Sequence, residues 1–179
     1  MAEKTKEKKI KAFFYYELVY SETQEAKDHY SKGRFGELKD GKIIYSLVEA
    51  FYLFQNKKMI IYDDKKKKID EKVFLVKSRK VEPNFGVRYA VFKDLRERGY
   101  IVKTALKFGA DFRVYDRGVK PGEDHAKWIV FPVHETETLT WYEWAAKNRV
   151  SHSTRKKLLL AIVDAELDVS YWEANWIKP

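Results

Sequence analysis

Hydrophobic and polar residues alternate along the first half of the chain with two different periods. Residues 11–20 are rich in aromatic and β-branched side chains and predict a strand. Apolar positions at helical spacing predict a helix over 43–54, and residues 59–62 predict another short strand. Glycines among polar residues predict a turn region over 28–40. This half is therefore expected to form an α+β arrangement.

The second half has a more regular pattern. A helix is predicted from Asn84 to Arg98, where Gly99 ends it, and Thr140 with Glu143 forms a capping box for a second helix that ends near Asn148. Apolar runs predict strands at 100–104, 110–115, 128–133, 157–164 and 169–177. We therefore expect two domains, an N-terminal α+β domain at 1–84 and an α/β domain with flanking helices at 85–179.

Charge narrows the class of partner. The formal net charge is +9 and the sequence pI is about 9.4, which favours a polyanion such as nucleic acid. Most arginines lie in 85–179, and their planar forks suit phosphate, so an RNA site is expected in that half. The lysine run within 63–68 is interpreted as a solvated turn.

The same composition argues against several other classes. The chain has no cysteine, which excludes disulfides and thiol chemistry. It has no apolar run long enough to span a membrane, and its charged start lacks the features of a secretory signal. The expectation is a soluble, intracellular protein of the cytoplasm. No phosphate-binding glycine loop or nucleophile elbow occurs, so no cofactor is expected.

Metal-dependent cleavage has weak support in the residues. The four histidines show no paired spacing typical of a zinc site. Asp111, Asp124 and Lys127 could form the carboxylate and lysine set of a magnesium-dependent nuclease, but their spacing departs from that pattern. The prediction is therefore no metal site, with this trio as the alternative.

Metal-free RNA cleavage fits the available side chains better. RNA carries its own nucleophile, the 2′-OH, so the protein needs only a base, an acid and a cation. Tyr115 ends a predicted strand, His125 follows the loop after it, and Lys156 begins the hydrophobic strand. Each also has an ordinary explanation, because strand-end tyrosines commonly pack and loop histidines are commonly solvated.

Three longer segments, 89–118, 125–130 and 148–164, strongly resemble the archaeal tRNA-splicing endonucleases. KFGADFRVY and SHSTRKKL are the most specific signals, SLVEAFYL resembles a helix of the family's N-terminal domain, and WIKP resembles its tail. The resemblance implies a nuclease-like second domain and an endoribonuclease that excises introns from precursor tRNA at bulge–helix–bulge junctions. It also implies cleavage without a metal, giving 2′,3′-cyclic phosphate and 5′-OH ends.

The resemblance also assigns roles to residues. Tyr115 corresponds to the general base, His125 to the general acid and Lys156 to the charge stabiliser. Arg149 corresponds to a side chain that grips a bulge base, and Tyr171 or Trp172 stands near a second gripping position, although strand packing explains them equally well. The acidic residues of the predicted turn after residue 163 correspond to a subunit-docking loop: Asp164, Glu166 and Asp168.

Assembly follows from the same likeness, with alternatives left open. Two similar cleavage sites need two active sites at a fixed distance, which a symmetric homotetramer, a dimer of dimers, provides. The alternatives are the catalytic half of a heterotetramer with a structural partner chain, and a non-catalytic RNA-binding subunit.

Overall fold

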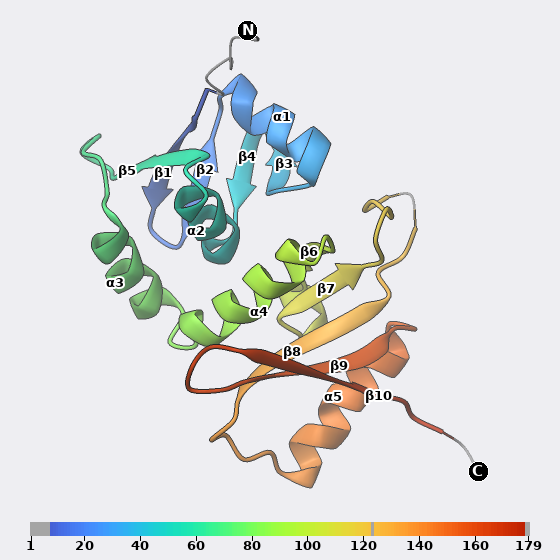
Figure 1. Ribbon diagram of the computed structural model, residues 1–179. Coiled ribbons are helices and arrows are strands. Elements are labelled where there is room, and N and C mark those ends of the chain that lie inside the picture. Colours follow the sequence, from blue (N-terminus) through green and yellow to red (C-terminus); the bar gives the residue numbers. More distant parts are fainter. Residues whose placement is uncertain (1–7, 123, 178–179) are drawn as a thin grey trace, which may run out of the picture. The chain divides into compact units, whose positions relative to one another are not determined.

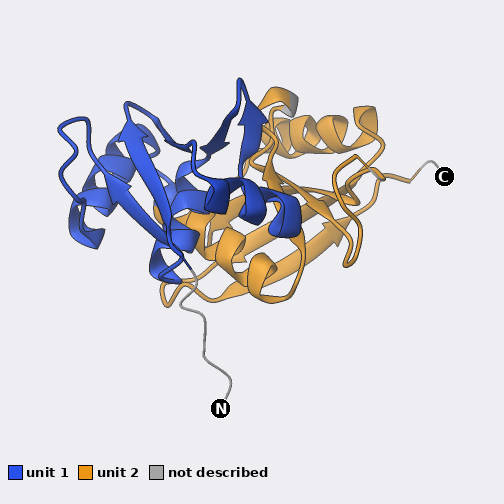
Figure 2. Ribbon diagram, turned by 90° about the horizontal axis from the view of Figure 1, so that it is seen from above, with its two compact units in different colours: residues 1–85 blue, residues 86–179 orange. Residues whose placement is uncertain are grey.

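The computed structural model describes residues 8–122 and 124–177, so the charged start of the chain and the last two residues of WIKP lie outside it. The chain divides into two compact units, residues 1–85 and 86–179 (Figure 2). Each unit contains a five-stranded mixed sheet with helices, which confirms the predicted α+β class (Figure 1). Within the described residues, no helix is long and apolar enough to cross a membrane.

The first unit has the strand order β3-β4-β2-β1-β5. Its β1 runs parallel to β5, whereas the other neighbouring strands pair antiparallel. In chain order the elements are β1 (Ile10–Tyr15), β2 (Leu18–Ser21), α1 (Gln24–Gly33), β3 (Glu37–Lys39), β4 (Lys42–Tyr45), α2 (Leu47–Gln55), β5 (Met59–Tyr62) and α3 (Glu71–Val81).

Three sequence expectations for this unit were wrong in part. The strand expected at 11–20 is a hairpin, because β1 and β2 turn at Tyr16 and Glu17. The region expected as a turn at 28–40 contains the end of α1 and all of β3. The helix expected over 43–54 begins only at Leu47, because its first apolar residues belong to β4 and Ser46 forms a capping box with Glu49.

An aromatic core holds the first unit together. Phe51 of α2 stacks on Phe74 of α3 with ring centroids 5.3 Å apart, and Phe14 of β1 meets Phe74 edge to face at 5.5 Å. The sequence reading did not assign α3, which begins where the Asp70 carboxylate accepts a hydrogen bond from the amide of Val73. The core therefore fixes α2 and α3 against β1.

The second unit begins with α4 (Phe85–Glu97), whose first residue still belongs to the first unit. Its sheet has the order β10-β9-β8-β7-β6, in which only β8 and β9 are parallel. The remaining elements are β6 (Ile101–Thr104), a 3₁₀ turn (Leu106–Phe108), β7 (Phe112–Tyr115), β8 (Trp128–His134), α5 (Trp141–Ser153), β9 (Lys157–Val163) and β10 (Val169–Ala174).

The sheet of the second unit is covered by one helix on each face. Phe92 of α4 packs against Phe112 of β7, with ring centroids 6.0 Å apart. On the other face, Ile129 and Leu158 form a buried cluster to which α5 contributes Trp144 and Val150. Side chains of each strand therefore alternate between an α4 face and an α5 face.

Candidate active site

Three chain segments meet at one end of the second sheet. Because β7 is antiparallel to β8, the end of β7 lies beside the start of β8. Because β8 is parallel to β9, with Trp128 opposite Lys157, the start of β9 lies at the same edge. Tyr115 ends β7, His125 precedes β8 and Lys156 precedes β9, so the topology gathers these three positions.

A cavity of about 380 Å³ opens at this end of the sheet. Its lining includes the three residues singled out for metal-free cleavage and, among the described residues, four more: Arg113, Gly122, Asp124 and Ala126. The structure thus brings Tyr115, His125 and Lys156 together around one hollow.

The strand β7 supplies two neighbouring polar groups. Arg113 and Tyr115 are two residues apart and share one face of the strand, whereas Phe112 and Val114 are fully buried on the other. Arg113 pairs with Ile129, which places it on the α5 face of the sheet. Tyr115 is only 5% exposed, so its ring is held by packing at the edge of the cavity.

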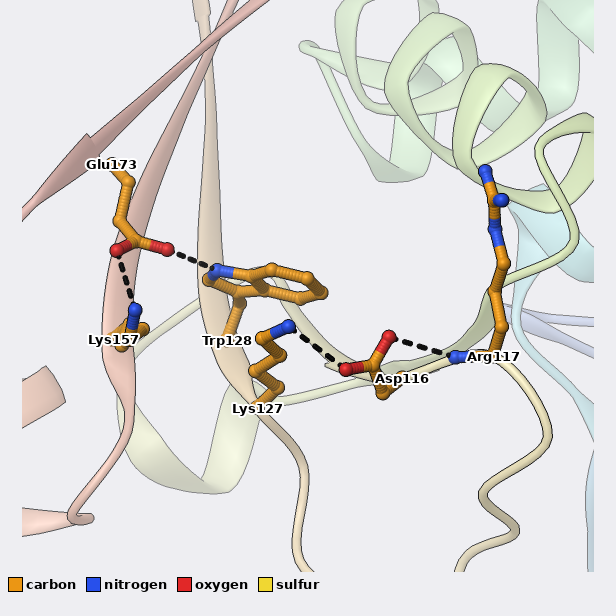
Figure 3. A network of polar contacts seen from close by, with 6 residues as sticks. All are labelled: Asp116, Arg117, Lys127, Trp128, Lys157 and Glu173. Carbon is orange, nitrogen blue, oxygen red and sulfur yellow. Dashed lines mark hydrogen bonds and ion pairs between the residues drawn. The ribbon is translucent and has the colours of Figure 1, made fainter.

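The loop that carries His125 is closed at its base by paired contacts. The Lys127 ammonium lies 2.8 Å from a carboxylate oxygen of Asp116 (Figure 3). The Lys127 amide donates to the carbonyl of Val114 at 2.9 Å. Within the loop, the His125 amide donates to the Asp124 carboxylate at 2.6 Å. These contacts fix the loop ends beside β7 and β8, so the exposed His125 is presented at the cavity.

A second set of contacts joins the strands at the same end of the sheet. The Glu173 carboxylate of β10 accepts hydrogen bonds from the Lys157 ammonium at 2.7 Å and from the Trp128 indole at 2.8 Å (Figure 3). These bonds lower the pKa of Glu173 to about 2, and the bond from Lys157 has the largest effect. The contacts link β8, β9 and β10 and so support the frame on which His125 and Lys156 are mounted.

Lys156 is positioned by the C-terminal cap of α5. The Lys156 amide donates to the carbonyl of Ser151 at 2.9 Å, and the Arg155 amide donates to that of His152 at 3.0 Å. With Arg155 at φ 54°, this is a Schellman motif in which arginine occupies the left-handed position usually given to glycine. The cap turns the chain sharply from α5 into β9 and leaves Lys156 at the cavity.

Two cationic side chains, those of Arg113 and Lys156, line the cavity and repel each other. Burial, and then the charge of Arg113, lower the pKa of Lys156 below its ordinary value. Its ammonium donates to the carbonyl of Thr154 at 2.8 Å. The Nε of Arg113 is buried and has no hydrogen-bond partner among the residues that the structure describes. An anion such as a phosphate in the cavity would relieve this repulsion.

The residues of the alternative metal site do not meet in this cavity. Asp111 is paired with Arg88 of α4 at 2.8 Å, and Lys127 is paired with Asp116. Burial raises the pKa of Asp111, although the charge of Arg88 acts in the opposite direction. Of the three, only Asp124 lines the hollow. The pairing of Asp111 with Arg88 anchors the start of β7 against α4.

The predicted RNA-gripping residues occupy different surroundings. Arg149 lies on α5 and lines a separate hollow with Trp176, outside the cavity of Tyr115. Trp172 is 64% exposed on β10. Tyr171 is partly buried, and its hydroxyl donates to the Asp94 carboxylate at 2.7 Å, which favours the packing alternative for this residue.

The acidic segment forms the tight turn between β9 and β10. One Asp164 carboxylate oxygen accepts the amide of Asp168 at 2.8 Å, which closes the turn. The carboxylates of Glu166 and Asp168 are exposed, and Leu167 between them is 57% exposed with φ 68°. Asp164 therefore shapes the turn, while the other two acids are presented to the surroundings.

Sequence reasoning did not single out Arg113 as a site residue. The signal was present, because Arg113 and Tyr115 share the polar face of a strand whose other face is apolar. What the sequence does not contain is the register that places this face beside Lys156. The structure supplies that register through the pairing of β7 with β8 and of β8 with β9.

Comparison with known proteins identifies the family. Residues 85–171 match the family model of the tRNA intron endonuclease catalytic C-terminal domain, and residues 10–75 match that of its N-terminal domain. A tRNA-splicing endonuclease of Nanoarchaeum equitans is 47% identical over 139 residues, which cover 74% of this chain and 88% of that protein. One of Pyrococcus horikoshii is 40% identical over 173 residues, covering 96% and 98%. These matches confirm the resemblance seen in the sequence, and the chain belongs to the tRNA intron endonuclease family.

Proposed function

We propose that the chain excises introns from precursor tRNA by cutting RNA at bulge–helix–bulge junctions. The observation that carries this proposal is the cavity at the end of the second sheet, where Tyr115, His125 and Lys156 meet. Membership of the tRNA intron endonuclease family supports the substrate. A precursor tRNA as substrate favours the cytoplasm as the place where the chain acts.

The proposed reaction is an internal transesterification. The phenolate of Tyr115 accepts the proton of the 2′-OH, and the 2′-oxygen attacks the adjacent phosphorus. The bond from phosphorus to the 5′-oxygen breaks, and the imidazolium of His125 donates its proton to that leaving oxygen. The products are a 2′,3′-cyclic phosphate and a 5′-OH. One P–O bond forms and one breaks, one proton is accepted and one is donated, so the proposed scheme balances without including a metal.

Charge stabilisation in this scheme comes from Lys156 together with Arg113. The phosphorane-like transition state carries more negative charge on its non-bridging oxygens than the substrate does. The Arg113 side chain, whose Nε is buried, and the partly desolvated ammonium of Lys156 are at the same hollow and are preorganised for that charge. Arg113 is therefore added to the three residues that the family resemblance implies.

Base gripping is proposed for Arg149 and Trp172. Both side chains are exposed, and a guanidinium or an indole can stack on an unpaired base. The family resemblance implies that this grip reaches RNA from an opposing subunit, and Arg149 accordingly lines a hollow other than that of Tyr115. This assignment therefore requires an oligomer.

We propose a homotetramer in which the acidic turn docks on a basic surface of another copy. The exposed carboxylates of Glu166 and Asp168 on a closed turn support this role. A heterotetramer with a structural partner chain would use the same turn. Cleavage by the purified chain alone separates the two assemblies, because the heterotetramer requires the partner.

The general acid role of His125 has a direct chemical test. We expect His125→Ala to slow cleavage of ordinary RNA by roughly two to four orders of magnitude while precursor binding is retained. A substrate whose leaving 5′-oxygen is replaced by sulfur needs no proton donor, so it should restore most of the rate of His125→Ala. Tyr115→Phe is the matched control and should stay slow on both substrates. Equal slowing of His125→Ala on both substrates would contradict the assignment.

A further inference from the structure

A second hollow with different chemistry lies in the first unit. Its volume is about 390 Å³, and it is lined by residues from the end of β1, from the loop after β5 and from α3: Phe14, Tyr15, Tyr16, Asp64, Lys77, Lys80 and Val81. Because β1 and β5 are parallel, their ends lie at the same edge of the sheet. The topology therefore places the β1–β2 turn beside the loop that follows β5.

Two tyrosines at this turn are exposed, and one of them has a left-handed backbone conformation. Tyr15 is 52% exposed and Tyr16 is 79% exposed, and their rings stand edge to face with centroids 4.5 Å apart. Tyr16 also has φ 51°, a left-handed conformation that is uncommon for a bulky aromatic residue. A surface that only needed solvation would place asparagine or glycine at this position. The strained backbone instead holds an aromatic ring out into the surroundings.

Two lysines of α3 line the same hollow as these rings, Lys77 and Lys80. The Lys77 ammonium lies 5.3 Å from the centroid of Phe14, which is almost fully buried beneath the hollow, and Lys80 is one helical turn further along α3. Four exposed lysines follow Asp64 in the adjoining loop: Lys65, Lys66, Lys67 and Lys68. The Asp63 carboxylate of that loop accepts hydrogen bonds from the amides of Lys65 and Lys67, so it serves to shape the turn.

Exposed aromatic faces beside flexible cations are the features with which proteins bind single-stranded nucleic acid. An unpaired base stacks on an aromatic ring, and the neighbouring phosphates meet the lysines. A double helix would not expose a base face for Tyr16, and an apolar protein partner would offer no negative charge to the lysines. The combination therefore selects unpaired RNA over the other candidates.

We propose that this surface binds a single-stranded segment of RNA, with one base stacked on Tyr16 and adjacent phosphates at Lys77 and Lys80. Of the residues that the structure describes, none lines both this hollow and the cavity of Tyr115. The inference thus adds a second RNA contact to the proposed function and does not depend on cleavage.

The test is fluorescence anisotropy with the full chain and a short, labelled 2′-O-methyl oligouridylate, which cannot be cleaved because its 2′-oxygen is blocked. Tyr16→Asn removes the ring while keeping a residue that accepts positive φ. We expect it to weaken binding roughly 5- to 30-fold, and Tyr16→Phe to bind as the wild type does. The same loss is expected in a Lys156→Gln background, which separates this surface from the cavity.

The lysines are tested by the salt dependence of binding. Each phosphate contact on a single strand contributes about 0.7 to the slope of log Kd against log salt concentration. The double variant Lys77→Gln/Lys80→Gln should therefore lower the slope by about 1.4. Lys27→Gln/Lys32→Gln on α1 makes the same charge change and should leave the slope at its wild-type value.

Two results would overturn the proposal. Unchanged oligonucleotide affinity in Tyr16→Asn would show that the ring stacks on no base. An unchanged affinity together with a lower sedimenting mass in Tyr16→Asn would show that the surface joins protein chains instead. Circular dichroism of each variant establishes that it is folded before its affinity is compared.

Discussion

Replacing Arg113 by Gln tests the electrostatic design of the cleavage cavity. The substitution removes one of the two cations at the hollow and leaves a shorter, neutral polar side chain. The structure predicts one effect on the transition state and one on the free protein. The transition state loses a preorganised donor, and the free protein loses the repulsion that lowers the pKa of Lys156.

The magnitudes follow from these contacts. A hydrogen bond to a charged group contributes about 1.5 to 3 kcal/mol, and about 1.4 kcal/mol corresponds to a factor of ten. Arg113→Gln should therefore lower kcat/KM roughly 10- to 150-fold. The free energy of unfolding should not fall by more than about 0.5 kcal/mol, because no hydrogen bond of the Arg113 Nε is lost. The pKa of Lys156 should rise toward its ordinary value.

Single-turnover cleavage, thermal unfolding and NMR titration of the lysine side chains measure these three quantities. Arg117→Gln, in the exposed start of the following loop, makes the same charge change and should keep cleavage within about twofold of the wild type. Arg113→Gln with normal cleavage would refute the role of Arg113. A loss of stability as large as the loss of transition-state binding would show that the side chain is structural.

Other contacts give independent predictions. The pKa of Glu173 is lowered to about 2 in the folded protein, from an ordinary value of 4.5. The carboxylate therefore stabilises the fold above pH 4.5, and this contribution is lost as the pH falls toward 2. The Tm difference between wild type and Glu173→Gln should vanish over that range. Reversing Glu166 and Asp168 to lysine, with the turn-closing Asp164 retained, should lower the sedimenting mass, and an unaltered mass would remove the turn from assembly. Tyr171→Phe should lower the free energy of unfolding by roughly 1 to 2 kcal/mol without changing RNA affinity, because the Tyr171 hydroxyl bonds Asp94. Trp172→Ala should lower RNA affinity without changing the free energy of unfolding.

Elements with strong local signals were predictable from the sequence, and those fixed by tertiary contacts were not. Capping at Thr140 indicated the start of α5, and Gly99 indicated the end of α4. The hairpin at Tyr16 was missed because neither Tyr16 nor Glu17 is a turn-forming residue type. Helix α1 was missed because its residues are mostly polar and only Ala26 is fully buried.

The candidate site shows the same division. Tyr115, His125 and Lys156 could be named from the sequence because the surrounding segments resemble a known family. Their convergence depends on the parallel pairing of β8 with β9, which no local pattern in the sequence reveals. The same holds for the pairing of Asp116 with Lys127, since its residues are eleven positions apart and meet only when the loop closes.

The most direct test of the central claim is to incubate the purified chain alone with a bulge–helix–bulge precursor tRNA in EDTA and to map both product ends. The account predicts cleavage at both bulges, with 2′,3′-cyclic phosphate and 5′-OH ends. Cleavage that requires added Mg²⁺ would contradict the proposed roles of Tyr115, His125 and Lys156. Absence of cleavage in both conditions would contradict the homotetramer and require a partner chain.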